Sequence, residues 1–374
     1  MTDIRYGLVG SGYFGRALGL ALEALPGASV TTVFDPENAG PVCVELDARE
    51  ASSIAELCAS SDVDAVIIAS PNWAHAEPVL EAARNGKHVF CEKPIALSYE
   101  ECSRMIDATQ ASSVLFMAGH VMNFMTGVRS VKALIADGVI GDVLFSRAAR
   151  TGWAQPQSEI SWKNQRKLSG GHLYHHIHEL DLIQSIMGPA VEVTMVGGNV
   201  AHHAPGFGDE DDLLLITLEF GNQSFAVLEY GSAFRWPEHH VLIEGTLGAI
   251  RIDLQEAHVT VRVDGKDKRL LLHRTPEEDA DRARVYREGT TDGAITYGNP
   301  QSSPPLWLTG IIEEELGYFH SLMSGADPIA EFAALTDGTA ATASIATADA
   351  LTRSLAEKRK VFVSEITAPA PTTA

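Results

Sequence analysis

The stretch from Ser169 to Asp181, SGGHLYHHIHELD, holds four histidines and two acids in thirteen positions. Neutral imidazoles and a carboxylate can ligate zinc or manganese, and His175 with Glu179 four residues later is a workable ligand spacing on a helix. The same groups can move protons near neutral pH, or can be satisfied polar groups at the rim of a pocket. Other groups that could converge on a metal are His202, His203 and the acidic run 209–212.

A glycine-rich loop, Gly10-Ser11-Gly12-Tyr13-Phe14-Gly15, follows one apolar run and opens another. In dinucleotide-binding folds the three glycines permit a tight turn, close approach of a pyrophosphate, and close helix–strand packing. The pyrophosphate then lies on the free N–H groups of the helix N-terminus. Asp35, about twenty residues later, can accept hydrogen bonds from a ribose 2′-hydroxyl and repel a 2′-phosphate. The pattern predicts an NAD site and disfavours NADP; the alternative is a glycine turn without a ligand.

The segment Cys91-Glu92-Lys93-Pro94 ends an apolar strand-like run. In parallel sheets, ligands bind beyond the carboxyl ends of the strands. Oxidising an alcohol requires removal of its hydroxyl proton as hydride leaves carbon. A lysine near a cationic nicotinamide can have a lowered pKa or polarise that oxygen, although a Glu–Lys pair is more commonly a solvated surface feature.

The elements that would position these groups fall into two patterns. Up to about Gly119, strands (4–10, 29–34, 65–70, 88–94, 114–120) alternate with helices (14–25, 74–85, 99–110), which predicts a parallel sheet covered on both faces. Later strands (191–198, 213–220, 224–232, 240–246, 248–254, 258–264) alternate polar and apolar residues and predict a mostly antiparallel sheet. Helices are expected at 126–137, 173–187, 306–323 and 335–357, and a long polar loop at 273–305.

The predicted fold class is therefore α/β, with an N-terminal Rossmann doubly wound parallel sheet. A C-terminal α+β domain follows, with an open, mostly antiparallel sheet. The expected domains are 1–122 for the cofactor and 123–366 for substrate and oligomer contacts, with a disordered tail at 367–374. The C-terminal helix is expected to pack back on the first domain.

The amino-acid composition limits the classes of binding partner that the protein can have. The 374 residues carry 28 basic and 49 acidic side chains, a formal net charge of −21, which disfavours nucleic acid and anionic membranes as partners. No apolar run is long enough to span a bilayer. Four cysteines without a CxxC pair, and no signal peptide, predict small core residues in a reducing, cytoplasmic setting. An open sheet face suggests a homodimer or homotetramer.

Taken together, the glycine loop, Asp35, SPNWAH (70–75) and CEKP (91–94) resemble the Gfo/Idh/MocA family, named for glucose–fructose oxidoreductase and inositol dehydrogenase. AGHVMNF through DGVIGDV (118–143) and HVLIEGTLGAIRID (240–253) extend the resemblance over nearly the whole chain. It implies that Glu92 contacts the nicotinamide ribose, that Lys93 transfers the proton, and that Pro94, often cis in the family, sets the turn. It also implies a cofactor site lined by Ser70, Pro71, Asn72 and His75 together with the loop residues Gly10, Gly12, Tyr13, Phe14 and Gly15. Family substrates are mostly sugars, polyols and their keto forms.

The chain departs from the family in the histidine stretch. The family pattern GGG-x-x-x-D-x-G-x-H-x-x-D aligns on His178 and Asp181, which places Tyr174 where the family has an aspartate. A phenol can hold a hydroxyl but is not a carboxylate at neutral pH, so the partner of His178 is open. At about 100° per residue, these three residues share one helical stripe. A second stripe, roughly opposite, carries His175, His176 and Glu179; a metal there stays an alternative, although hydride transfer requires none.

Candidate substrate groups lie on either side of this stretch. Trp153, Trp162 and Lys163 could form an aromatic platform for a sugar, or could be core and subunit-interface residues. The aromatic and basic run 234–240 has the same two interpretations. His120, Tyr174, Asp181 and Trp153 are expected to orient the substrate ring. Asn123 stands where many relatives have an arginine.

The function expected from the resemblance is NAD-dependent hydride transfer from a secondary hydroxyl of a sugar, glycoside or cyclitol, with Lys93 and His178 bracketing the reacting oxygen. One alternative is a redox-assisted lyase or hydrolase. In it a transient ketone acidifies the neighbouring hydrogen, elimination follows, and NAD is regenerated in each turnover. The second alternative is a non-catalytic, NAD-binding regulatory protein.

Overall fold

The computed structural model describes residues 3–288 and 303–368. Most of the predicted tail, and the stretch 289–302 of the predicted loop, lie outside these residues. The chain forms two compact units. Of the described residues, the first comprises 3–125, 273–285 and 303–341, and the second 126–272, 286–288 and 342–368.

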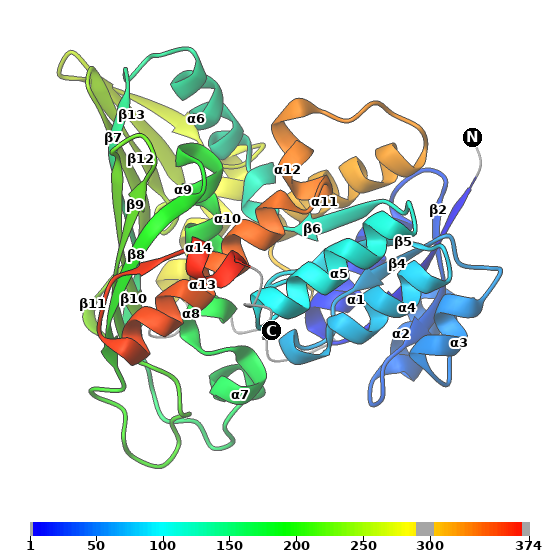
Figure 1. The fold of residues 1–374 in the computed structure, drawn as a ribbon. Coiled ribbons are helices and arrows are strands. Elements are labelled where there is room, and N and C mark those ends of the chain that lie inside the picture. The colour runs from blue at the N-terminus through cyan, green and yellow to red at the C-terminus, as the bar shows by residue number, and fades with distance from the viewer. Residues whose placement is uncertain (1–2, 289–302, 369–374) are drawn as a thin grey trace. The chain divides into compact units, whose positions relative to one another are not determined.

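The first unit contains a six-stranded parallel sheet, drawn blue to cyan in Figure 1. Its order is β3-β2-β1-β4-β5-β6, and its strands are β1 (Ile4–Val9), β2 (Ala28–Phe34), β3 (Arg49–Glu50), β4 (Ala65–Ile68), β5 (His88–Glu92) and β6 (Phe116–Gly119). The helices between them are α1 (Tyr13–Glu23), α2 (Ala39–Leu46), α3 (Ile54–Ala59), η1 (Asn72–Ala74), α4 (Ala76–Arg84) and α5 (Tyr99–Ala111). Every residue of β4 is buried, as its continuous apolar run predicts. The predicted doubly wound parallel sheet is confirmed.

Local signals account for several helix ends in this unit. Helix α5 begins after Ser98, whose hydroxyl accepts a hydrogen bond from Glu101 N at 3.2 Å, and Glu100 and Glu101 carry negative charge in its first turn. The short elements β3, α2 and α3 were not predicted, because they are brief and lack clear periodicity.

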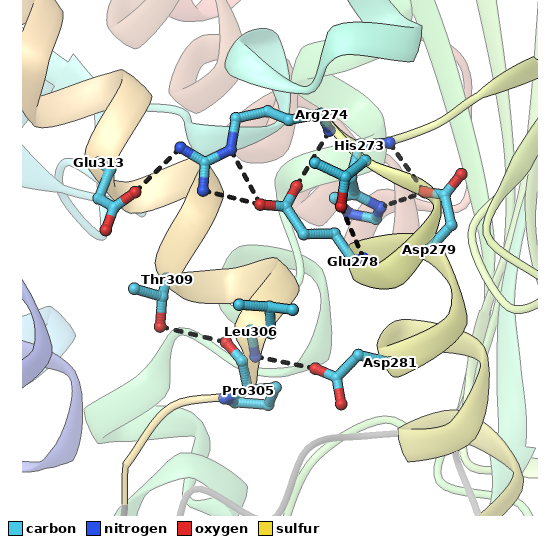
Figure 2. A network of polar contacts seen from close by, with 10 residues as sticks. His273, Arg274, Glu278, Asp279, Asp281, Pro305, Leu306, Thr309 and Glu313 are labelled. Carbon is cyan, nitrogen blue, oxygen red and sulfur yellow. Dashed lines mark hydrogen bonds and ion pairs between the residues drawn. The ribbon is translucent and has the colours of Figure 1, made fainter.

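The prediction of a long loop at 273–305 is wrong for the first half of that range. Residues Pro276–Glu288 form helix α10, with proline in the first turn and acids beside it. Its sequence is so polar that it lacks an apolar stripe, so periodicity did not reveal it. Figure 2 shows how the helix is held: Arg274 bonds both Glu278 (2.7 Å) and Glu313 (2.9 Å).

The contact continues at the start of helix α11 (Leu306–Met323), where Leu306 N donates to Asp281 at 2.8 Å (Figure 2). This unit also contains η2 (Val121–Phe124), η4 (Ala330–Phe332) and α12 (Ala333–Thr336). Helix α11 coincides with the predicted range.

The second unit contains a nine-stranded, mostly antiparallel sheet, in which only β10 and β7 pair in parallel among the described strands. Its order is β14-β13-β12-β11-β7-β10-β9-β8-β15. The strands are β7 (Val143–Trp153), β8 (Ala190–Gly198), β9 (Leu213–Phe220), β10 (Phe225–Gly231), β11 (Ala233–Gly245), β12 (Gly248–Asp253), β13 (His258–Val263), β14 (Lys266–Leu271) and β15 (Val361–Phe362). The predicted antiparallel sheet is confirmed, but β7, which lies fifth in that order, was not predicted.

The single helix expected at 173–187 is wrong, because the structure breaks it in two. Helix α8 (His172–His175) ends where His176 leaves the helical region (φ −108°, ψ 40°), and α9 (His178–Met187) begins after one further residue. The other helical segments here are α6 (Thr126–Ala136), η3 (Trp162–Asn164), α7 (Arg166–Ser169), most of α13 (Thr339–Glu357) and α14 (Ser364–Thr367). Gly338, with φ +86°, precedes α13, so the helix predicted from 335 starts later.

All four cysteines are free and buried, which confirms their prediction as core residues. Among the described residues, no helix is both long and apolar enough to cross a membrane.

Candidate active site

The glycine loop has the geometry that a dinucleotide requires. Gly10 has φ +88°, and a Cβ there would lie 2.5 Å from Ser70 N. A Cβ on Gly15 would lie 1.9 Å from the Gly10 carbonyl oxygen, whereas one on Gly12 would meet nothing within 4 Å. Gly10 is therefore required for the turn and Gly15 for close packing, whereas Gly12 leaves open space. No side chain caps the N-terminus of α1, which is the end of the helix where a pyrophosphate would bind.

Asp35 lies beside this loop, at the end of β2. Its Oδ2 accepts a hydrogen bond from Ser11 N at 2.7 Å, and its Oδ1 accepts from Glu37 N and Asn38 N, each at 2.9 Å. These backbone donors fix the carboxylate next to the loop. The arrangement fits an NAD cofactor, with the loop amides for the pyrophosphate and Asp35 for a ribose.

The SPNWAH and EKP segments are joined by His75. Its Nδ1 lies 2.8 Å from the Pro94 carbonyl oxygen and its Nε2 lies 2.8 Å from that of Ser70. The ring is buried, and burial lowers the pKa of His75. The Lys93–Pro94 bond is cis. His75 thus holds together two segments that were predicted to line the cofactor.

Glu92 is a buried acid next to Lys93. Its Oε2 accepts a hydrogen bond from Lys93 N at 3.2 Å, while its buried Oε1 has no partner among the described residues. Burial raises the pKa of Glu92 to about 7, against the charge of Lys93, which lowers it. An oxygen in this state can hold a ribose hydroxyl, as the family resemblance implies.

A second buried acid, Glu315 on α11, was missed by the sequence reasoning. It is 0% exposed, and neither carboxylate oxygen has a hydrogen-bond partner within the described part of the chain. Burial raises the pKa of Glu315 well above its usual range, and the charge of Glu92 adds to the shift. Helical spacing was the available signal, because Glu315 shares a face with Leu308, Ile311 and Phe319.

His120 directly precedes η2 and Asn123 lies within it, and both residues are buried. Asn123 Nδ2 donates to the His120 carbonyl oxygen at 3.0 Å. The structure thus ties these two residues to each other; their predicted substrate roles stay predictions.

In the second unit, Glu179 is the centre of a buried polar network. Its carboxylate, 0% exposed, accepts hydrogen bonds from Arg150 (3.1 Å), Tyr230 (3.1 Å) and His239 Nε2 (2.7 Å). Burial alone would raise the pKa of Glu179, but Arg150 and His239 hold it well below its usual range. His239 Nδ1 lies 2.6 Å from the Tyr286 hydroxyl. Of this network, Glu179 was named from the helical stripes and His239 as part of the run 234–240, whereas Arg150, Tyr230 and Tyr286 were not named.

The histidines beside Glu179 form a cluster of rings. His172 and His176 have ring centroids 4.4 Å apart, His175 and His176 4.8 Å, and Trp162 lies 5.9 Å from His175. Burial, with the charge of Arg150, lowers the pKa of His172 to about 3, so this ring is neutral. No group of three or more histidines, cysteines or acids in the described ranges is placed to hold a metal ion.

The stripe expected to be catalytic packs against α13. The Tyr174 hydroxyl donates to Asp349, and Asp181 Oδ1 accepts from Ser344 at 3.0 Å. Burial raises the pKa of Tyr174 well above its usual range, and the charge of Asp349 adds to this. His178 lies at the first position of α9 and is half-buried. Tyr174 and Asp181 therefore have packing partners, and their roles toward a substrate stay predictions.

A basic side chain lies near the ring of each of the two tryptophans that were predicted to form a sugar platform. Arg235 Cζ lies 3.5 Å from the ring centroid of Trp153, and Lys163 Nζ lies 5.9 Å from that of Trp162. Burial lowers the pKa of Lys163. Nearby, Ser169 Oγ donates to Glu210 at 3.4 Å, and burial raises the pKa of Glu210 to about 8, which makes it a neutral acid at pH 7.

Comparison with known proteins places the chain in a family. Residues 4–120 match the NAD-binding Rossmann-fold model of the Gfo/Idh/MocA oxidoreductases, and residues 132–363 match that family's C-terminal alpha/beta domain. The chain belongs to the Gfo/Idh/MocA oxidoreductase family. This confirms the resemblance seen in the sequence motifs.

Two relatives share about half of their residues with this family member. It is 52% identical to the 2,7-anhydro-N-acetylneuraminate hydratase of Mediterraneibacter gnavus, over 98% of each chain. It is 50% identical to the protein of the same name from Escherichia coli, over 97% of this chain and 98% of that one. Levoglucosan dehydrogenase, solved in complex with NADH and L-sorbose, has the same fold, with a TM-score of 0.78 at 23% identity over 97% of this chain and 99% of that one.

Proposed function

We propose that this chain is a hydratase of 2,7-anhydro-N-acetylneuraminate that uses NAD as an internal redox cofactor and returns it unchanged after each turnover. The observation that carries the proposal is the identity of 50–52%, over nearly the full chain, to two proteins of that name. Of the alternatives raised by the sequence, this favours redox-assisted bond cleavage over net dehydrogenation.

The substrate's own chemistry explains why a hydratase would need an oxidoreductase fold. The bond to be opened joins C2 to O7, and C3, next to C2, carries hydrogens that are not acidic. Oxidation of the C4 hydroxyl to a ketone makes them acidic. A base then takes a C3 proton, the C2–O7 electron pair leaves on O7, which is protonated, and a C2–C3 double bond forms. Water adds at C2, C3 regains a proton, and the ketone is reduced again, so the sum is addition of one water.

Bound NAD would supply the reversible hydride acceptor. In the first unit, the glycine loop would hold the pyrophosphate and Asp35 the adenosine ribose, which favours NAD over NADP because a 2′-phosphate would meet that carboxylate. Glu92 would hold the nicotinamide ribose. Lys93 would take the C4 hydroxyl proton during oxidation and return it during reduction.

The elimination requires a base for C3 and an acid for O7, which the second unit can supply. The cluster of His175 and His176, together with His178 on the next helix, offers imidazoles for the base. His172 is a weak base, because its pKa is lowered to about 3. Glu210, neutral at pH 7, is the candidate proton donor.

The test is to incubate the purified protein with 2,7-anhydro-N-acetylneuraminate and substoichiometric NAD in D₂O. We expect complete conversion to N-acetylneuraminate, deuterium at C3 by NMR, and no NADH accumulating in proportion to product. Lys93→Ala should lower turnover by roughly 10²- to 10⁴-fold, the usual contribution of a positioned acid–base group. NADH formed one-to-one with a keto product would instead support a dehydrogenase. NAD binding without turnover of this substrate or a sugar panel would support a regulatory protein.

A further inference from the structure

The proposed substrate is an acid, so the site that binds it needs a cation for its C1 carboxylate. Several arginines of the second unit are already committed to carboxylates: Arg147 pairs with Glu229, Arg150 with Glu179 and Arg166 with Asp211. Arg235 is different. It forms no ion pair or hydrogen bond to another described residue, although it is held in place by an aromatic ring.

The backbone explains why Arg235 stands away from the sheet. Strand β11 pairs with β7 through Ala233 opposite Trp153 and then through Glu238 opposite Thr151. The residues 234–237 therefore face a single β7 residue, Gly152, and form a bulge. Bulges commonly redirect a side chain next to a functional site. Arg235 lies in this bulge and is exposed.

The guanidinium of Arg235 packs over an aromatic ring and makes no hydrogen bond to another described residue, so its N–H groups are available to a ligand. Its Cζ lies 3.5 Å from the Trp153 ring centroid, so the cation covers the aromatic face. A guanidinium held in this way is already ordered, and its N–H groups match the two oxygens of a carboxylate. Less entropy is lost on binding than with a freely moving side chain.

Trp153 also connects Arg235 to the histidine stretch. Its ring lies 4.8 Å from that of the buried His202, whose Nδ1 is 3.0 Å from Asp212. The charge of Asp212 in turn acts on His172, at the start of α8. The Arg235–Trp153 pair is thus linked by ring packing and a hydrogen bond to Asp212, whose charge reaches the cluster that carries the candidate bases. Lys163, the cation on Trp162, is a weaker choice, because burial disfavours its charged form.

We propose that Arg235, held against Trp153, binds the C1 carboxylate of the substrate and makes the enzyme selective for acidic sugars. This inference rests on the proposed function for the identity of the ligand. It assigns a binding role and no chemical step, so substitution should affect KM and leave kcat nearly unchanged.

The test measures binding of N-acetylneuraminate and of its C1 carboxamide, by calorimetry in the presence of NAD. For the wild type we expect the acid to bind roughly 10- to 100-fold more tightly than the carboxamide, the range typical of hydrogen bonds to a charged group. Arg235→Gln should lose this preference. Its affinity for the acid should fall, whereas its affinity for the carboxamide should stay within about twofold of that of the wild type. Arg262→Gln, which removes an exposed cation paired with Asp267 on β13 and β14, is the matched control and should behave as the wild type.

Two results would overturn the inference: a wild type that does not bind the acid in preference to the carboxamide, or an Arg235→Gln variant that keeps the preference. Both are independent of turnover. If the acid binds through Arg235 but 2,7-anhydro-N-acetylneuraminate is not converted, the proposed function fails and the binding role stands. If conversion occurs and Arg235→Gln has an unchanged KM, the binding role fails and the function stands.

Discussion

Glu179 in the second unit and Glu315 in the first are both 0% exposed, but their surroundings differ completely. Glu179 accepts hydrogen bonds from Arg150, Tyr230 and His239. Glu315 has no hydrogen-bond partner in the described residues and has another acid, Glu92, near it. The pKa of Glu179 is accordingly lowered and that of Glu315 raised. Burial disfavours the charged form of both carboxyl groups, and the neighbouring hydrogen-bond donors and charges decide which of the two acids stays ionised.

The difference matters for the chemistry assigned to each unit. A charged Glu179 holds His239 and Arg150 in fixed positions beside the histidine cluster. A neutral Glu315 keeps the surroundings of Glu92 and Lys93 low in negative charge.

Replacing Glu179 should give the largest effect on stability. We expect Glu179→Gln to lose about 3–5 kcal/mol of unfolding free energy at pH 7, because it removes the buried negative charge to which the partly buried Arg150 and His239 are hydrogen-bonded. Urea denaturation followed by tryptophan fluorescence measures the loss. The control is Glu357→Gln, which removes an exposed acid paired with Arg353 and Arg359 and should leave the unfolding free energy nearly unchanged. Equal losses in the two variants would contradict the assignment of Glu179 as a charged, partnered acid.

The pH dependence of the Glu179 variant follows from the direction of its pKa shift. A lowered pKa in the folded state stabilises the protein above the unfolded-state value of about 4.5, and this contribution is lost as the pH falls through the folded-state pKa. The difference in unfolding free energy between the wild type and Glu179→Gln should therefore be largest at pH 7 and should become smaller below pH 4.5.

Glu315→Gln should have the opposite pH dependence. The raised pKa of Glu315 means that the folded state holds its proton more tightly than the unfolded state does. Its stabilising contribution is complete below the unfolded-state pKa and is lost as the pH rises toward the folded-state pKa. Glutamine does not titrate. Above pH 5, the unfolding free energy of the variant should therefore rise relative to that of the wild type by up to about 1.4 kcal/mol per pH unit. Melting temperatures from pH 5 to 8 measure this; parallel curves would mean that Glu315 is ionised and has a partner.

Much of the fold could be predicted from the sequence, because its signals are local. The glycine loop, Asp35 and the EKP segment each occupy a few consecutive residues, and the parallel sheet follows from apolar runs separated by helices. Strand β7 was missed because arginines at 147 and 150 interrupt its apolar alternation, and both pair with acids on other elements. Helix α10 was missed because it is polar throughout and is held by ion pairs rather than by an apolar face.

The partners within the candidate site could not be predicted, because they are distant in sequence. Glu179 and His239 are separated by 60 positions, and Tyr174 and Asp349 by 175. Helical phase placed Tyr174 and Glu179 on different stripes of one continuous helix, but the structure breaks that helix between them. It could not show that one lies against α13 and the other against the sheet, since that depends on tertiary packing.

The smallest expected effect comes from the outer end of the Glu179 network. Tyr286→Phe removes the hydroxyl that lies 2.6 Å from His239 Nδ1 and should cost about 1 kcal/mol in urea denaturation. If Glu179, His239 and Tyr286 act as one unit, the double variant with Glu179→Gln should deviate from additivity by at least about 0.5 kcal/mol. Paired with Glu315→Gln, which belongs to the other unit, the same change should be additive within that margin. Additivity in both pairs would mean that Tyr286 is an independent surface contact and that the network ends at His239.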